Sequence, residues 1–194
     1  MSVEIFDLLK IIDNVKHLRR TGWTKFAEIT EVESVASHMY RMSLLSWSLA
    51  KDRPDLDINK CIKMSLIHDL AEGDESVGDI TPYCGVSDEK KYELELGAFM
   101  KIVSYVPECV GKEWIELWKD YEIQGSNEAK CVKQLDKFDM IAQAWEYEQK
   151  YKVDLSQFFD STKDIFNFSP VDIWAEKLLG SRTHYREQNN ISNK

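Results

Sequence analysis

The segment LIHDLAE, residues 66–72, places a histidine and an aspartate side by side between apolar residues. The apolar neighbours indicate that His68 and Asp69 are at least half buried, and burying such a pair is costly unless a positive charge binds it. On a helix, Glu72 lies one turn beyond His68 and points the same way. The segment thus predicts half of a divalent-metal site, although the dipeptide alone more often means a solvent-exposed His beside a surface Asp.

Nearly every periodic stretch around this segment is helical in pattern. Apolar residues recur at three- and four-residue spacing in the stretches 5–18, 34–51, 58–71, 87–103, 114–121, 126–142 and 169–185. Asp57, Ser87 and Ser126 are suitable N-caps, and Ser169 followed by Pro170 is a strong helix start. We find no alternation typical of strands, no internal repeat and no linker. The sequence therefore predicts an all-α fold with one helical-bundle domain over 1–186 and a polar tail over 187–194.

The composition narrows the range of partners. A net charge of −9 argues against a nucleic-acid polymer or an anionic membrane as the main partner, but it permits a small phosphorylated ligand in a local pocket. No apolar run approaches the ~20 residues that a membrane span needs, and no signal peptide is evident. The four cysteines form no C-x-x-C pair, which favours reduced thiols over a thiolate zinc site. We expect a cytoplasmic protein, with the nucleus as an alternative.

Three further residues interrupt the predicted pattern. His38 occupies an otherwise aliphatic stripe of the 34–51 helix, and Asp136 directly follows the inward Leu135 of the 126–142 helix. Asp79 lies in the turn-rich loop over 73–88, and a loop of this length beside a candidate site is often functional. Each residue alone has an ordinary structural explanation: a core histidine bonded to a carbonyl, a solvated helix-edge aspartate, or a turn aspartate.

Together, His38, the pair His68-Asp69 and Asp136 follow the order H…HD…D on three predicted helices. This order resembles the signature of the HD-domain metal-dependent phosphohydrolases, in particular those of the 5'-deoxynucleotidase type. The supporting segments are RTGW at 20–23, ESVASHMYRM at 33–42, VGDITP at 77–82 and EAKCVKQLD at 128–136.

The chain departs from the family pattern after Glu72, where the step to Gly78 and Asp79 looks expanded by about two residues. This leaves open whether Asp74 or Asp79 is the loop carboxylate, although the Val-Gly-Asp-Ile context favours Asp79.

The resemblance implies one divalent ion bound by His38, His68, Asp69 and Asp136. A mixed nitrogen and oxygen ligand set with room for water suits Mn, Co, Mg, Fe, Ni or Zn. Such an ion supplies hydroxide near neutral pH and screens the phosphoryl oxygens. Asp69 thus belongs to both the metal set and the catalytic set.

Glu72 is the other candidate catalytic residue. It could orient the attacking water, protonate the leaving 5'-oxygen, or bind a second ion together with Asp79 and Ile80. The sequence does not choose among these roles.

The resemblance also implies a substrate-binding set of Arg20, Trp23 and Asp79. Arg20 would hold the phosphate, Trp23 would close the sugar side and discriminate against a 2'-hydroxyl, and Asp79 would accept a bond from the 3'-hydroxyl. Without the resemblance, Arg20 is equally well explained as a partner of a helix C-terminal dipole.

The leading hypothesis is thus an enzyme that hydrolyses (deoxy)nucleoside 5'-monophosphates to nucleoside and phosphate. One alternative is an HD-type phosphodiesterase or pyrophosphohydrolase that acts on a cyclic or polyphosphorylated nucleotide. Another is a non-catalytic helical adaptor that keeps a structural metal. We also expect a homodimer, because the resemblance implies one and because large aromatic residues are numerous for a small helical core.

Overall fold

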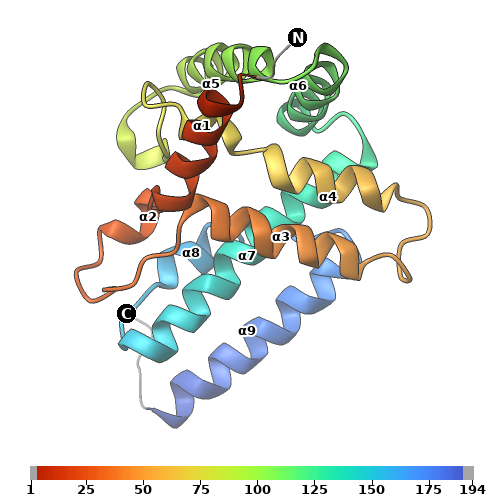
Figure 1. The fold of residues 1–194 in the computed structure, drawn as a ribbon. Helices are drawn as coiled ribbons and strands as arrows, with labels where there is room; N and C mark the ends of the chain where they lie inside the picture. Colours follow the sequence, from red (N-terminus) through yellow and green to blue (C-terminus); the bar gives the residue numbers. More distant parts are fainter. Residues whose placement is uncertain (1–3, 190–194) are drawn as a thin grey trace. The chain divides into compact units, whose positions relative to one another are not determined.

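The computed structural model describes residues 4–189, and within that range it contains helices but no strand, which confirms the all-α prediction (Figure 1). A single antiparallel bridge joins Arg19 and Ser34. The α-helices are α1 (Ile5–His17), α2 (Thr21–Thr24), α3 (Val35–Ser48), α4 (Ile58–Ile67), α5 (Asp88–Ile102), α6 (Glu108–Ile123), α7 (Asn127–Tyr151), α8 (Ser156–Asp160) and α9 (Val171–Gln188). The 3-10 turns are η1 (Leu70–Gly73), η2 (Pro82–Cys84) and η3 (Val103–Tyr105).

The helix starts follow the predicted caps. Asp57 accepts a hydrogen bond from the Lys60 N–H at 3.1 Å, and Ser87 accepts one from the Lys90 N–H at 3.2 Å. These bonds satisfy backbone donors that have no partner inside the helix, which is why short oxygen-bearing side chains are favoured there.

Several predicted boundaries were wrong. The third helix does not continue to residue 71: α4 ends at Ile67, and the chain then tightens into η1, where the Glu72 N–H bonds the Asp69 carbonyl at 3.1 Å. Short α2 lies where a break was expected, and Pro170 rather than Ser169 directly precedes α9. Helix α9 also runs on to Gln188, into the expected tail, whereas residues 190–194 of that tail lie outside the described residues.

Contacts between η1 and α1 explain why α4 ends early. Asn14 Nδ2 donates to the Gly73 carbonyl at 2.7 Å, and a Cβ on Gly73 would lie 2.7 Å from the Ile11 carbonyl oxygen. Only glycine permits so close an approach. Tertiary contact with α1 therefore overrides the local helical periodicity.

The chain divides into two compact units, Met1–Val132 and Lys133–Lys194, with the boundary inside α7. In the second unit a buried ion-pair network joins α7 to α9: Glu148 accepts from Arg182 Nε at 2.7 Å and from Arg182 Nη2 at 2.8 Å. Glu148 also accepts from the Leu155 N–H at 3.0 Å. This bidentate pair and its backbone partner fix the start of α8.

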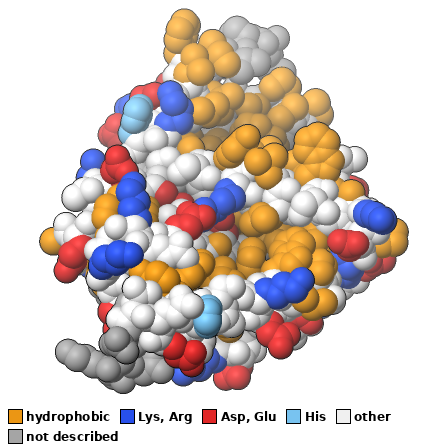
Figure 2. Space-filling model, turned by 90° about the horizontal axis from the view of Figure 1, so that it is seen from below, with side chains coloured by type: hydrophobic (Ala, Val, Ile, Leu, Met, Phe, Trp, Pro, Cys, Tyr) orange, Lys and Arg blue, Asp and Glu red, His pale blue; other side chains and the backbone are white. Residues whose placement is uncertain are grey.

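The large aromatic side chains do not support the argument for a dimer that was made from them. The residues that prompted it are Trp114, Trp118, Tyr121, Trp145, Tyr147, Phe158, Phe159 and Trp174. Five of these eight are buried within the single chain: Trp118, Tyr121, Tyr147, Phe158 and Phe159. Several exposed apolar side chains lie on α1 and α3, namely Ile5, Phe6, Leu9, Ile12, Tyr40, Leu44 and Trp47, and others lie on other elements, namely Leu66, Tyr83, Met100, Ile123, Ile173 and Leu179. Figure 2 shows broad areas of hydrophobic side chains on one face of the molecule. No helix among residues 4–189 is long and apolar enough to cross a membrane.

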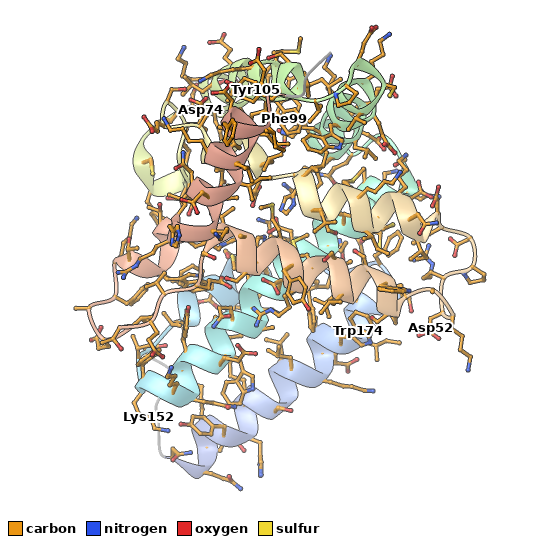
Figure 3. All side chains as sticks on the ribbon, in the orientation of Figure 1. Asp52, Asp74, Phe99, Tyr105, Lys152 and Trp174 are labelled. Atoms are coloured by element: carbon orange, nitrogen blue, oxygen red, sulfur yellow. The ribbon has the colours of Figure 1, made fainter. Side chains whose placement is uncertain are left out.

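The first unit is built from α1, α3, α4, α5 and α6. Helix α3 packs along α4, α6 packs against α4, and both α1 and α5 pack against η1. Phe99 of α5, labelled in Figure 3, stacks on Trp118 of α6 with ring centroids 5.3 Å apart. The segment at 68–73 is thus packed between α1 and α5.

Candidate metal centre

His68 is held by its own backbone neighbourhood. Its main chain caps α4, where its N–H donates to the Met64 carbonyl at 2.9 Å, and its side chain is 1% exposed. Its Nδ1 lies 3.0 Å from the Ser65 carbonyl oxygen. Because a carbonyl oxygen can only accept, Nδ1 must carry the hydrogen, so Nε2 of the neutral ring carries a lone pair.

Three charged or ligating groups lie close to one carboxylate oxygen of Asp69. Its Oδ2 lies 3.2 Å from His68 Nε2, 3.8 Å from His38 Nε2 and 3.9 Å from Arg20 Nη1. The two imidazole centroids are 5.5 Å apart. The structure therefore brings together His38 from α3, His68 from the end of α4 and Asp69 from the start of η1.

The electrostatic surroundings favour an ionised Asp69. Burial opposes its charge, but the neighbouring His68, His38 and Arg20 outweigh the burial and hold the pKa of the Asp69 carboxyl below its usual range. A permanent carboxylate here is what a hard or borderline divalent cation prefers as a ligand.

The donor set fits a metal ion. The buried Nε2 of His68 makes no hydrogen bond within the described residues, and its lone pair faces the Oδ2 of an ionised Asp69. With Nδ1 as the donor to the Ser65 carbonyl, a neutral His68 ring has no second N–H to give to Asp69. A divalent cation between them would satisfy both, and the Nδ1–H bond of His68 to a carbonyl is the outer contact that orients a metal-binding histidine.

Glu72 lies in η1 with 6% of its surface exposed. Burial raises the pKa of Glu72 well above its usual value, and the nearby charges of Asp69 and Asp79 raise it further, while Arg20 and Lys91 partly offset them. This carboxyl group is therefore biased toward its protonated form in the metal-free protein, as a general acid requires.

Arg20 directly precedes α2, and Trp23 lies within it, so both belong to the Arg20–Trp23 turn. Trp23 is 1% exposed, and its Nε1–H donates to Glu33 Oε1 at 2.8 Å. An indole buried to this extent offers almost no surface to a sugar in this conformation, so its expected contact with the substrate stays a prediction.

The loop carboxylates have different partners. Asp74 is bound by Lys101 Nζ at 2.8 Å and by Ser76, which turns it toward α5. Asp79 accepts from the Thr21 N–H through its carboxylate, and its carbonyl accepts from Thr21 Oγ1 at 3.0 Å. Asp79, with the half-buried Ile80 next to it, thus lies against the Arg20–Trp23 turn, and its choice over Asp74 as the loop carboxylate stays a prediction.

Asp136 lies on α7 within the second unit, four residues after Val132. It is 7% exposed, and its Oδ2 lies 3.2 Å from Lys137 Nζ. The alternative explanation, a solvated helix-edge aspartate, is wrong, because the residue is buried. Its role as the fourth ligand stays a prediction.

The sequence analysis gave no role to Glu33, which is half-buried, or to Glu95, which is buried. Glu33 precedes the cap of α3, and Glu95 lies inside α5, where Lys91 Nζ approaches it to 2.9 Å. The spacing of Lys91 and Glu95 at i and i+4 was a detectable signal for the second. No periodic pattern marks Glu33.

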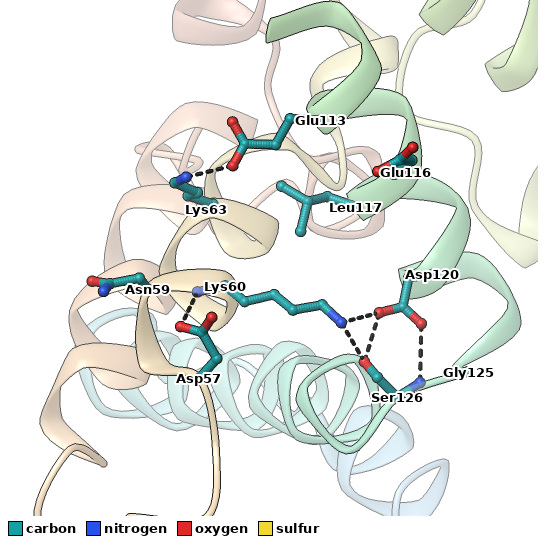
Figure 4. Close-up of a pocket in the computed structure, with 10 residues that line it drawn as sticks. All are labelled: Asp57, Asn59, Lys60, Lys63, Glu113, Glu116, Leu117, Asp120, Gly125 and Ser126. Carbon is teal, nitrogen blue, oxygen red and sulfur yellow. Dashed lines mark hydrogen bonds and ion pairs between the residues drawn. The ribbon is translucent and has the colours of Figure 1, made fainter. Parts of the chain in front are cut away.

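A cavity of about 650 Å³ opens between α4 and α6 (Figure 4), and none of the predicted site residues lines it. Its two lysines are paired with carboxylates: Lys60 with Asp120 at 2.8 Å, and Lys63 with Glu113. Its two positive charges are therefore paired, and Asp57 and Glu116 give the lining an excess of negative charge.

Known proteins match this chain along most of its length. A 5'-deoxynucleotidase of Dictyostelium discoideum is 42% identical over 172 residues, which cover 83% of this chain and 89% of that protein. The human 5'-deoxynucleotidase HDDC2 is 41% identical over 181 residues, covering 92% of this chain and 86% of the relative.

Solved structures share the fold. A conserved hypothetical protein from Pyrococcus furiosus superposes with a TM-score of 0.73 at 28% identity, covering 92% of this chain and 99% of that one. The HD domain-containing protein YGK1 superposes with a TM-score of 0.66 at 28% identity, covering 94% of this chain and 86% of that one. The family model described as "HD domain" matches residues 12–174, a range that includes His38, the His68-Asp69 pair and Asp136. The chain therefore belongs to the HD domain family.

Proposed function

We propose that this protein hydrolyses deoxynucleoside 5'-monophosphates to nucleoside and phosphate with the help of a divalent ion. The observation that carries this proposal is the buried lone pair of His68 facing the ionised Asp69, an arrangement that a divalent cation would satisfy. The substrate class is supported by relatives that carry the name 5'-deoxynucleotidase and match over most of the chain.

His38, His68, Asp69 and Asp136 are the residues that we propose as ligands. His38, His68 and Asp136 are all buried, and each offers one atom that could bind a metal. When bound, a divalent ion supplies an acidified water and a positive charge beside the phosphoryl oxygens.

The remaining residues act on the substrate. Arg20 binds a phosphate oxygen, which places the phosphorus close to Asp69. Water attacks phosphorus, the bond from phosphorus to the 5'-oxygen breaks, and the leaving 5'-oxygen takes the proton of the Glu72 carboxyl. The proton that the attacking water loses then returns to Glu72. Asp79 holds the Arg20–Trp23 turn in place through Thr21.

An alternative assigns Glu72, Asp79 and Ile80 to a second ion. It predicts two ions per chain, whereas Glu72 acting as the acid requires one. Metal analysis of the purified protein distinguishes these two proposals.

A homodimer is the assembly that we propose. It is supported by the exposed apolar side chains of α1 and α3, among which Phe6 is 83% exposed and Trp47 is 65% exposed. Exposed apolar surface of this kind commonly marks a protein interface. The cytoplasmic location stays a prediction from the cysteine pattern; the four thiols are free in the structure.

A panel assay tests the function. Phosphate release is measured with dAMP, AMP, 3'-dAMP, a cyclic nucleotide and a guanosine polyphosphate, with added Mn or Co and with a chelator. We expect release from dAMP to be fastest and to vanish with the chelator. Preference for a cyclic or polyphosphorylated substrate would support the alternative enzyme class, and no turnover with bound metal would support a helical adaptor.

A further inference from the structure

Glu33 lies where two distant segments meet. The Arg20 N–H donates to the Glu33 carbonyl at 3.1 Å, and the Val35 N–H donates to the Leu18 carbonyl at 2.9 Å. These two bonds, with the bridge between Arg19 and Ser34, pair the exit of α1 with the entry to α3. The backbone of Glu33 is therefore fixed beside the turn that carries Arg20.

The Glu33 side chain contacts Arg20, which we propose to bind the phosphate, and Trp23. Its Oε1 accepts from Trp23 Nε1–H at 2.8 Å and lies 3.7 Å from Arg20 Nε. The Glu33 side chain is 9% exposed and the Arg20 side chain 18% exposed, so water screens this contact weakly.

Arg20 lies between two carboxylates. Glu33 approaches it on the Nε side, whereas Asp69 Oδ2 lies 3.9 Å from Nη1. The guanidinium is therefore oriented with one terminal amino group toward Asp69. A planar guanidinium binds phosphate through its terminal amino groups, so this orientation is the productive one.

We propose that Glu33 is a positioning residue, which holds the Arg20 guanidinium toward the substrate phosphate and fixes the Trp23 indole behind it. This inference rests on the proposed function. A free arginine side chain samples many rotamers, and restricting them before the ligand arrives improves binding. The expected signature is therefore weaker substrate binding, with little change in the chemical step.

A competing interpretation is that Glu33 competes with the phosphate for Arg20. The geometry disfavours it, because at 3.7 Å the approach to Nε is too long for a hydrogen bond and lies away from the Nη1 side. The two interpretations predict opposite changes in KM, so kinetics separates them.

Glu33→Gln is the informative variant. Glutamine has the same shape and its oxygen can still accept from Trp23, but it lacks the charge that orients Arg20. We expect KM for dAMP to rise roughly tenfold, which corresponds to about 1.4 kcal/mol, with kcat changed less than about twofold. The metal content should stay at the wild-type value.

A double-mutant cycle tests whether the effect of Glu33 on KM passes through Arg20. In an Arg20→Ala background, Glu33→Gln should change KM by less than about twofold, because its effect passes through Arg20. Glu113→Gln, which removes the exposed carboxylate paired with Lys63, is the matched control and should leave KM unchanged.

The outcomes are distinguishable. Wild-type protein that releases no phosphate from dAMP would refute the proposed function, and the inference with it. Active wild type with an unchanged or lower KM in Glu33→Gln would refute only the role of Glu33, as would additive effects in the cycle. If Glu33→Gln fails to fold, Glu33→Asp is measured instead. It keeps the charge but withdraws it by one methylene, so an unchanged KM there would also refute the role.

Discussion

Replacing Glu72 with glutamine should change turnover and stability in opposite directions. In the metal-free protein the Glu72 carboxyl is buried, with Asp69 and Asp79 close enough to raise its pKa. Glutamine removes the ionisable proton but keeps the size and the hydrogen-bonding atoms of the side chain. The catalytic cost should be roughly a hundredfold in phosphate release, about 2.7 kcal/mol, which is the usual scale for losing a general acid.

The stability change follows from the direction of the pKa shift. A raised carboxyl pKa means that the folded protein binds this proton more tightly than the unfolded chain does. Stability from Glu72 is therefore fully present below the unfolded pKa, near 4.5, and is lost as pH rises through the folded pKa. Because glutamine cannot ionise, Glu72→Gln should stabilise the metal-free protein at pH 7 by about 0.5–2 kcal/mol.

Urea unfolding of the chelated protein at pH 4.5 and at pH 7, with dAMP turnover of the metal-loaded protein, provides the two measurements. A stabilised variant with less activity cannot be explained by general damage to the fold. Unchanged turnover would eliminate Glu72 as the acid. Lower stability at pH 7 would refute the account of its buried, unfavourable charge.

Three further predictions concern the supporting structure. Gly73→Ala should lower the free energy of unfolding by about 1–3 kcal/mol, because its Cβ would clash with the Ile11 carbonyl. Gly97→Ala is the control and should be neutral or stabilising, because Gly97 has open space around it in α5. Equal effects of the two substitutions would contradict this explanation. The Lys101 hydrogen bond lowers the pKa of Asp74 to about 2, so its contribution to stability is present above about pH 4 and lost toward pH 2. Asp74→Asn should remove that pH dependence and about 1 kcal/mol at pH 7, measured by denaturation across this range. Light scattering should give twice 22.7 kDa, and a mass of 22.7 kDa would rule out the dimer.

The sequence was sufficient for the fold class and for most helix starts, because apolar spacing and oxygen-bearing caps act locally. Ser87 caps its helix as predicted. The end of α4 was not predictable in the same way: the close approach of Gly73 to Ile11 is a contact between residues far apart in the sequence. A periodic pattern contains no information about such a contact.

The site residues likewise divide into those that the local sequence pattern predicts and those that depend on tertiary contacts. His38, His68 and Asp69 were predictable because polar residues stood where packing calls for apolar ones, and the structure brings these three together. Glu33 was not predictable, since its importance comes from a pairing of two loop segments that only the folded chain creates. The burial of Trp23 likewise depends on tertiary packing, and it weakens the expectation of a direct sugar contact.

A cobalt titration of the metal-free protein, followed in the same samples by phosphate release from dAMP, tests the central claim most directly. The account predicts that activity rises in step with the first equivalent of bound ion in the wild type. It also predicts that His68→Ala, which removes the lone pair facing Asp69, loses both the binding and the activity. Full phosphate release without bound ion, or stoichiometric cobalt binding by active His68→Ala, would contradict it.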